Sequence, residues 1–251
     1  MKKAALGIIA IAALLGTPAV AADMALKAPP PPPPPTWAGW YLGINGGGGW
    51  EQNDWSFPVA QFFATAANQG FSTNPSGGLV GGHFGYNAQW GQWVVGAEFD
   101  GDWMGLSQTL IGPVTPVYPL DTYTTKLYDL ETLTLRVGYA PGNWLWYGKG
   151  GIATGTVNLN VISGAPVAGV VFSNIQRQWG PTAGVGVEYM FAPHFIIGVE
   201  YDFAALSSES ISTNASCNGA ATCTGNTAVP VTMNSGTFNI STVVGRVSYK
   251  F

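Results

Sequence analysis

Apolar and polar residues alternate along the last stretch of the chain, residues 235–251. One face carries Phe251, Tyr249, Val247, Gly245 and Val243, whereas the intervening positions are mostly polar: Lys250, Ser248, Arg246, Val244 and Thr242. A period of two predicts a β-strand with one apolar and one polar face. An open strand of this kind would invite edge-to-edge aggregation, whereas a closed barrel in a membrane has no free edge. We therefore expect a transmembrane β-barrel that this strand closes against residues 40–50.

The same alternation recurs in seven earlier segments: residues 40–50, 78–90, 93–103, 127–140, 144–157, 176–190 and 195–203. Their connections alternate between long stretches (51–77, 104–125, 158–175 and 204–234) and tight turns (91–92, 141–143 and 192–194). Short turns on one rim and long loops on the other are typical of bacterial outer-membrane barrels. The sequence predicts an all-β, eight-stranded, antiparallel up-and-down transmembrane barrel, with short turns in the periplasm and long loops outside. Within the first long loop we expect a short helix over residues 58–68.

Aromatic residues gather near the ends of these segments, where amphipathic rings favour the membrane interfaces. We expect a periplasmic girdle of Trp90, Trp93, Tyr139, Trp144, Trp146, Phe191, Phe195, Tyr249 and Phe251. The outer girdle is expected to contain Trp50, Trp103, Phe172 and Trp179.

The first 22 residues have the three parts of an export signal. Lys2 and Lys3 precede the apolar run 6–15, and small residues follow at 19–21. That run is too short for a membrane-spanning helix, which needs about 20 apolar residues. Residues 23–36 then form a leader with an unbroken proline run at 29–35, which predicts a stiff polyproline spacer. The leader is either a plain periplasmic spacer or a tether that contacts peptidoglycan or a partner. Residues 37–251 form the barrel domain.

Charged residues make up only 9% of the chain, well below the ~25% typical of soluble proteins. Past the signal, no segment resembles a membrane helix, so alternating lipid-facing strands account best for the low charge. The formal net charge is −4, and Lys and Arg do not cluster. This balance argues against a nucleic-acid partner.

Six segments resemble, in order, the outer-membrane immunogenic protein family of α-proteobacteria, which are small porin-like barrels of the OmpA-type eight-stranded class. They are WAGWYLGINGG from Trp37, GGLVGGHFGYN from Gly77, LTLRVGYA from Leu133, WYGKGGIA from Trp146, GVGVEYMF from Gly184 and the terminal Tyr249-Lys-Phe251. The proline run departs from the usual N-terminus of the family. The resemblance implies a surface antigen or permeability protein, and it supplies no catalytic residues. It also implies that the final strand, with Tyr249 and Phe251, is the signal that the barrel-assembly machinery reads.

Charged residues on the inward-facing positions predict a polar lumen. The acidic members are Glu98, Asp100, Asp102, Glu188, Glu200 and Asp202, and the basic members are Arg136, Lys149, Arg246 and Lys250. Such charges would cost about 2–4 kcal/mol each near the middle of the lipid-facing wall. Eight strands leave room only for side chains inside. We therefore expect ion pairs at similar depth, such as Arg136, Lys149 and Arg246 with Glu98, Glu188 and Glu200, and the resemblance implies that they plug the lumen. The alternative is a charged constriction of a narrow diffusion channel. Ile196, Phe238 and Ile240 break the polar pattern, and a β-bulge that changes the facing is one explanation.

The sequence contains two histidines, His83 and His194, and neither predicts an enzyme. His83 lies within a strand among Gly and Asn, where a hydrogen-bonded lumen histidine is expected, and His194 lies in a short turn. We expect no catalytic residues, no cofactor and no metal site, since no His/Cys cluster has ligand spacing. Cys217 and Cys223 predict a local disulfide in the last outer loop. That loop shapes the surface or presents an epitope or receptor site.

Two functions remain open from the sequence. One is a surface protein of the outer membrane that contributes to envelope integrity and to surface interaction and antigenicity, in contact with lipid and lipopolysaccharide. The alternative is a small porin that passes hydrophilic solutes. Loops carry such specificity, and those of this chain indicate no particular ligand.

Overall fold

The computed structural model describes residues 36–60, 66–112, 120–164, 170–217 and 229–251. Contacts between Cα atoms divide the chain into two units, residues 1–34 and 35–251, and the described residues all belong to the second. The predicted signal and the proline run lie outside the described residues, so both stay predictions. Among the residues described, no helix is long and apolar enough to cross a membrane.

The described residues form eleven β-strands. They are β1 (Gly39–Phe57), β2 (Gln69–Thr73), β3 (Ser76–Trp90), β4 (Trp93–Ile111), β5 (Thr122–Tyr139), β6 (Trp144–Ile162), β7 (Val170–Ala192), β8 (Phe195–Leu206), β9 (Ser210–Cys217), β10 (Val229–Ser235) and β11 (Phe238–Lys250).

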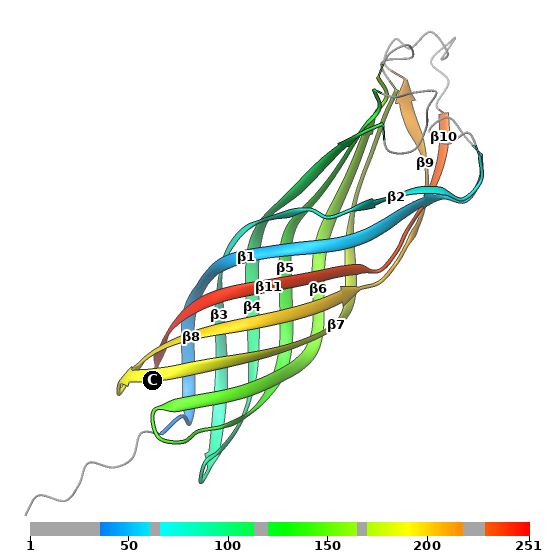
Figure 1. The fold of residues 1–251 in the computed structure, drawn as a ribbon. Helices are drawn as coiled ribbons and strands as arrows, with labels where there is room; N and C mark the ends of the chain where they lie inside the picture. Colours follow the sequence, from blue (N-terminus) through cyan, green and yellow to red (C-terminus); the bar gives the residue numbers. More distant parts are fainter. Residues whose placement is uncertain (1–35, 61–65, 113–119, 165–169, 218–228) are drawn as a thin grey trace, which may run out of the picture. The chain divides into compact units, whose positions relative to one another are not determined.

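Eight of these strands close a barrel (Figure 1). Around the ring the order is β1, β3, β4, β5, β6, β7, β8 and β11, and every pairing is antiparallel. The closing pair is β1 with β11, in register from Tyr41↔Lys250 to Gln52↔Asn239. Gly91 and Gly142 have φ angles of 62° and 69° in the short turns, a conformation that favours glycine. The predicted eight-stranded up-and-down fold and its seam are confirmed.

The strands continue beyond the predicted segments, into what the sequence indicated as long loops. β1 runs to Phe57 and pairs there with β2 and β10, while β9 pairs with β10 and β7. On the outward face of β1, the apolar series that includes Trp50 gives way to Gln52 and Asp54. This change indicates that the outer extension stands in water rather than in lipid. Of residues 58–68, the structure describes 58–60 and 66–68, and none of these is helical.

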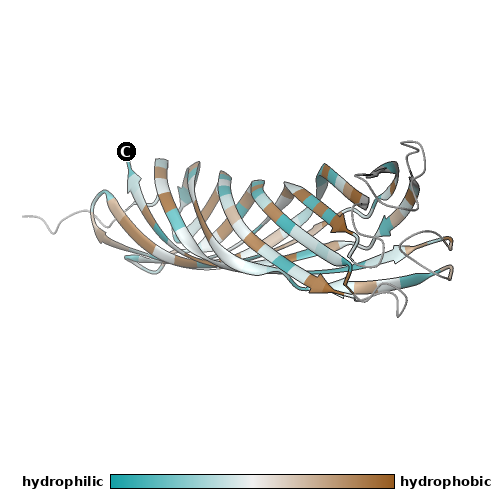
Figure 2. Ribbon diagram, turned by 90° about the horizontal axis from the view of Figure 1, so that it is seen from above, coloured by the Kyte–Doolittle hydropathy of each residue, from teal (hydrophilic) through white to brown (hydrophobic). Residues whose placement is uncertain are grey.

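Figure 2 shows that hydrophobic and hydrophilic residues alternate along individual strands. The predicted girdle residues are exposed on the outer wall, for example Trp90 at 66% and Trp103 at 75%. Phe172 is the exception and the prediction for it is wrong, because this side chain is 1% exposed and packs inside the barrel. Phe172 and Trp179 are an odd number of positions apart on β7, so the period of two places them on opposite faces.

Inward-facing side chains fill the lumen in three layers. At the short-turn end, an apolar layer contains Trp37, Val94, Ala140, Leu145, Tyr147, Met190 and Ile196. A charged layer occupies the middle, and an outer apolar layer follows that includes Trp55, Phe57, Tyr123, Leu127, Phe238 and Ile240. β11 pairs with β8 without a register shift from Phe238 to Tyr249. The β-bulge explanation is therefore wrong for Phe238 and Ile240, and likewise for Ile196, which keeps its inward alternation in β8. All three residues point inward and belong to the two apolar layers: Ile196 to the layer at the short-turn end, and Phe238 and Ile240 to the outer layer.

Candidate functional site

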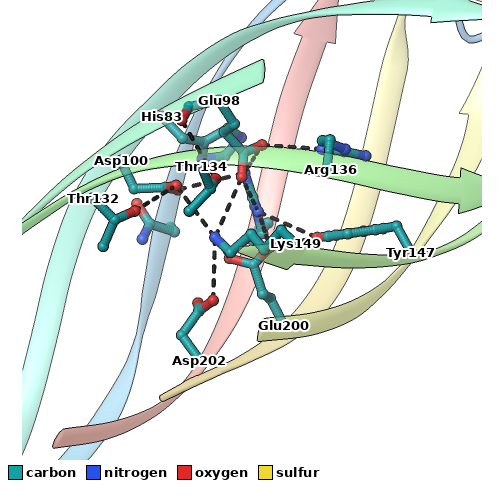
Figure 3. A network of polar contacts seen from close by, with 12 residues as sticks. His83, Glu98, Asp100, Thr132, Thr134, Arg136, Tyr147, Lys149, Glu200 and Asp202 are labelled. Carbon is teal, nitrogen blue, oxygen red and sulfur yellow. Dashed lines mark hydrogen bonds and ion pairs between the residues drawn. The ribbon is translucent and has the colours of Figure 1, made fainter. Parts of the chain in front are cut away.

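Lys149 lies at the centre of the charged layer, surrounded by four carboxylates (Figure 3). Its Nζ atom lies 2.8 Å from Glu200 Oε1, 3.2 Å from Asp202 Oδ1, 3.3 Å from Asp100 Oδ2 and 3.4 Å from Glu98 Oε1. These carboxylates come from β4 and β8, on opposite sides of the ring from one another. One ammonium group on β6 therefore links distant parts of the wall.

Arg136 on β5 links two further carboxylates. Its Nη1 lies 3.0 Å from Glu98 Oε2 and its Nη2 lies 2.8 Å from Glu188 Oε2. The guanidinium carbon lies 4.0 Å from the centroid of the Tyr147 ring, a cation–π distance. Arg136 is 1% exposed, so these contacts replace the hydration of a charge that is removed from bulk water.

Arg246 on β11 completes the ion-pair layer. Its Nη2 lies 2.6 Å from Glu98 Oε2, and its Nη1 pairs with Glu200. Two tyrosine hydroxyls add hydrogen bonds to the same carboxylates, from Tyr41 to Glu98 at 2.8 Å and from Tyr147 to Glu200 at 2.5 Å. Neither tyrosine is among the site residues predicted from the sequence, although their alternation with outward-facing neighbours could have placed them inside.

Two of the predicted lumen charges lie apart from this centre. Asp102 accepts a hydrogen bond from Asn45 Nδ2 at 2.7 Å. Lys250 lies at the short-turn rim, where its Nζ donates to the Ala38 carbonyl at 3.2 Å. Lys250 is buried, as its predicted inward position implies, and it has no carboxylate partner among the described residues. The last strand ends at the rim, too far along its axis for Lys250 to reach the central carboxylates.

Glycines on the inward face of β7 make room for this network. A Cβ atom at Gly186 would lie 2.4 Å from Tyr147 Cζ, and one at Gly184 would lie 2.0 Å from Asp202 Oδ1. Either side chain would collide with a group that holds the network. Gly184 and Gly186, which alternate with the outward-facing Val185 and Val187, are therefore required by packing across the lumen.

The charged layer lacks the arrangement of a hydrolytic site in the part of the chain that the structure describes. His83 Nε2 lies 2.7 Å from Ser248 Oγ, but His83 Nδ1 has no hydrogen-bond partner there, so no acid orients the ring as a catalytic triad needs. His194 lies in the β7–β8 turn, with Nδ1 2.7 Å from the Lys250 carbonyl oxygen. Oxygens of Glu98, Asp100 and Glu200 lie within 4.8 Å of one another, yet Lys149 and Arg246 contact all three carboxylates. The layer is a set of ion pairs.

Trp37, just before β1, closes the short-turn end of the lumen. Its side chain is 0% exposed, its backbone N–H donates to Gln89 Oε1 at 2.7 Å and its indole Nε1 donates to the Gly142 carbonyl at 3.3 Å. The alternating pattern could not reveal this role, because Trp37 lies outside the strand. The sequence feature that could have indicated this role is an aromatic residue placed directly after the proline-rich leader.

Cys217 ends β9, and Cys223 lies outside the described residues. The disulfide therefore stays a prediction.

Comparison with known proteins identifies the family. A model of the outer membrane protein β-barrel domain matches residues 9–251. The chain belongs to this family. Membership places the protein in the outer membrane, in agreement with the closed barrel and its apolar wall.

Solved structures of outer-membrane barrels are similar in fold to this protein. The outer membrane protease OmpT from Escherichia coli is 10% identical with a TM-score of 0.53, over 85% of this chain and 97% of that one. OprG from Pseudomonas aeruginosa is 17% identical with a TM-score of 0.51, over 85% and 96%. Ail, the attachment invasion locus protein of Yersinia pestis, is 14% identical with a TM-score of 0.40, over 85% and 99%. No curated protein sequence matches the chain. At these identities the likeness concerns the fold alone.

Proposed function

We propose that this protein is a sealed outer-membrane barrel that contributes to envelope integrity and presents its outer extension to the cell's surroundings. The observation that carries the proposal is the filled lumen, in which an ion-paired layer lies between two buried apolar layers. Eight-stranded barrels have interiors just wide enough for side chains. A hydrophilic solute would have to displace all three layers to cross.

The energetics support a closed state. Glu98, Glu200, Arg136, Lys149 and Arg246 are each at most 7% exposed. Opening a path would separate pairs in this layer, and an uncompensated buried charge costs about 3–5 kcal/mol. Such a cost keeps the open population small unless another contact offsets it.

A small porin is the second candidate, because of the composition of the charged layer. Five carboxylates (Glu98, Asp100, Glu188, Glu200 and Asp202) form ion pairs with three cations (Arg136, Lys149 and Arg246) there. A pathway through this layer would therefore favour cations over anions.

Single-channel recording in planar bilayers tests the two functions. Refolded protein should show no steady current at either polarity, while an open porin in the same chamber gives steps. Reproducible nanosiemens steps from the refolded protein would contradict the sealed barrel. Selectivity for cations in those steps would support the porin.

Outside the lumen, the last outer loop is expected to contain the Cys217–Cys223 disulfide, which would shape a surface that partners or antibodies meet. A bridge over so short a loop contributes about 2 kcal/mol. Equal thiol labelling with and without reductant would exclude it.

A further inference from the structure

A polar pocket opens on the outer extension where β1 changes partners. Its cavity volume is about 300 Å³, and its lining includes Asn53, Asp54, Ser72, Asn74, Thr237 and Asn239. β1 pairs with β11 as far as Gln52↔Asn239 and with β10 from Trp55↔Ser235. Between these pairings, residues 236–237 leave the ladder and form one side of the pocket.

Backbone and side-chain bonds hold the rim in place. The Gly236 N–H donates to the Asp54 carbonyl at 2.6 Å, and Ser72 Oγ donates to Asp54 Oδ1 at 2.6 Å. The Asn74 N–H donates to Gln108 Oε1 at 2.6 Å. Segments from β1, from β2 and its exit, and from the β10–β11 connection are thus fixed around one opening.

One residue of the pocket lining carries an unpartnered buried acceptor. Asn53 is 4% exposed, and its Nδ2 donates to the Gly236 carbonyl at 3.5 Å. Asn53 is one of the lining residues, and its buried Oδ1 has no hydrogen-bond partner among the described residues. A buried polar atom that stays unsatisfied costs about 1–3 kcal/mol. A hydroxyl donor that reached Oδ1 from the cavity would remove this cost.

The chemistry of the lining selects the class of ligand. It consists of amides and hydroxyls with the single carboxylate of Asp54, and it includes no basic side chain. A phosphate or another anion would meet no cation here, whereas a sugar offers hydroxyls that both donate and accept. A volume of about 300 Å³ is at the lower end for small-molecule pockets and suits a ligand of sugar size.

The pocket lies directly beyond the lipid-facing wall. Trp50, an outer-girdle residue that is 43% exposed, precedes Gln52 and Asp54 on the outward face of β1. Interfacial tryptophans mark the depth of lipid headgroups. We propose that this pocket binds a neutral sugar residue of a surface glycan, with Asn53 and Asn239 as hydrogen-bonding residues. The sugar comes either from a glycolipid headgroup in the same leaflet or from a free saccharide. This site does not depend on whether the lumen conducts.

Saturation-transfer NMR on the refolded full-length chain in detergent micelles tests the site. The probes are the methyl glycosides of glucose, galactose and mannose. At least one should receive saturation from the protein, and Asn239→Leu should reduce that signal at least fivefold. Thr109→Leu makes the same polar-to-apolar change at an exposed position of β4 and should leave the signal unchanged. If Asn239→Leu does not refold, Asn74→Ala at the exposed rim gives the same test.

A second arm distinguishes the two sources of the sugar. The methyl glycoside signal should persist in phosphatidylcholine nanodiscs. Its loss in nanodiscs that also contain glucosyl diacylglycerol assigns the pocket to a lipid headgroup, and its persistence there assigns it to a free saccharide.

Three outcomes would overturn the proposal. They are the absence of transfer to all three glycosides, equal transfer in Asn239→Leu and the parent chain, and Ca²⁺ binding that Asp54→Asn abolishes in a protein without a sugar signal. The bilayer recording does not test this proposal: neither the absence nor the presence of conductance changes the expected sugar signal.

Discussion

Residues of the charged layer differ in the number of ion pairs that they form. Arg136, Lys149 and Arg246 each contact at least two carboxylates, and all three contact Glu98. Glu98 is therefore the acceptor on which the three cations converge. Removal of one cation leaves several carboxylates short of compensation at once.

Arg136→Ala should destabilise the refolded barrel by about 3–5 kcal/mol, because it leaves the buried Glu188 without its cation and removes one of the three cations that contact Glu98. Urea unfolding in micelles measures the change, and planar bilayers report any new conductance. Lys126→Ala removes an exposed cation from the outer face of the same strand and should have little effect. If Arg136→Ala altered neither stability nor current, the network would have no role in closing the lumen.

Glu51 is the carboxyl whose environment predicts a pH effect on the outer extension. It is 0% exposed, neither of its oxygens has a hydrogen-bond partner among the described residues, and burial raises its pKa from 4.5 to about 8. Below about pH 4.5 both the folded and the unfolded state hold the proton, so Glu51 adds no pH dependence. Between the two values only the folded state holds it, and stability falls as the pH rises towards about 8.

Glu51→Gln should therefore flatten the decrease in unfolding free energy between pH 5 and pH 9, by an amount on the order of a few kcal/mol. Urea midpoints at the two pH values check this. Asp54→Asn, at an exposed position of the same strand, is the matched control and should keep the parent's pH difference. A parent-like slope in Glu51→Gln would exclude Glu51 as its source.

At the scale of elements, β11 closes the barrel along its full length. Its pairing with β1 and β8 is continuous, and the Phe251 N–H donates to the Trp40 carbonyl at 2.9 Å just past its end. Phe251 itself is 68% exposed and its ring lies 5.2 Å from that of Tyr249. The terminal aromatic thus adds little burial to the seam, and we propose that the assembly machinery recognises it.

Deletion of Phe251 should lower the amount of protein inserted in the outer membrane of cells while changing the stability of refolded protein by about 1 kcal/mol or less. Cell fractionation and urea unfolding give the two readouts. Phe191→Ala removes another exposed girdle phenylalanine and should leave insertion near normal. Normal surface levels of the deletion variant would contradict the assembly role.

The outer ends of the strands show what a repeating pattern can miss. The sequence predicts β1 over 40–50, where its outward face is apolar, but the strand continues to Phe57. Beyond Trp50 the outward face becomes polar while Trp55 and Phe57 still point inward. In such a strand the apolar residues change from the outward face to the inward face. A search for apolar residues on the lipid-facing side alone therefore assigns the outer part of the strand to a loop.

At the scale of the molecule, the barrel unit begins near the end of the proline run. Contacts assign residues 35–251 to one unit, and Trp37 is its first fully buried side chain. A chain that begins at residue 35 should therefore refold with the same urea midpoint as one that begins at residue 23, because Trp37 still closes the short-turn end of the lumen. A chain that also lacks residues 35–38 should be less stable. Equal stability of these two truncated chains would contradict the role of Trp37.

The sequence alone determined the number of strands in the closed barrel, their antiparallel order and the seam, because a period of two and the lengths of connections are local properties. It also placed Glu98, Arg136, Lys149, Glu200 and Arg246 in the lumen, since a charge on the lipid-facing wall is too costly. Only the tertiary structure decided which cation contacts which carboxylate within this group, as Glu98 and Arg246 are 148 positions apart in the chain. It likewise decided the two apolar layers, the inward position of Phe172 and the pocket beside Asn53. These features depend on register and on distances across the lumen, which no local pattern contains.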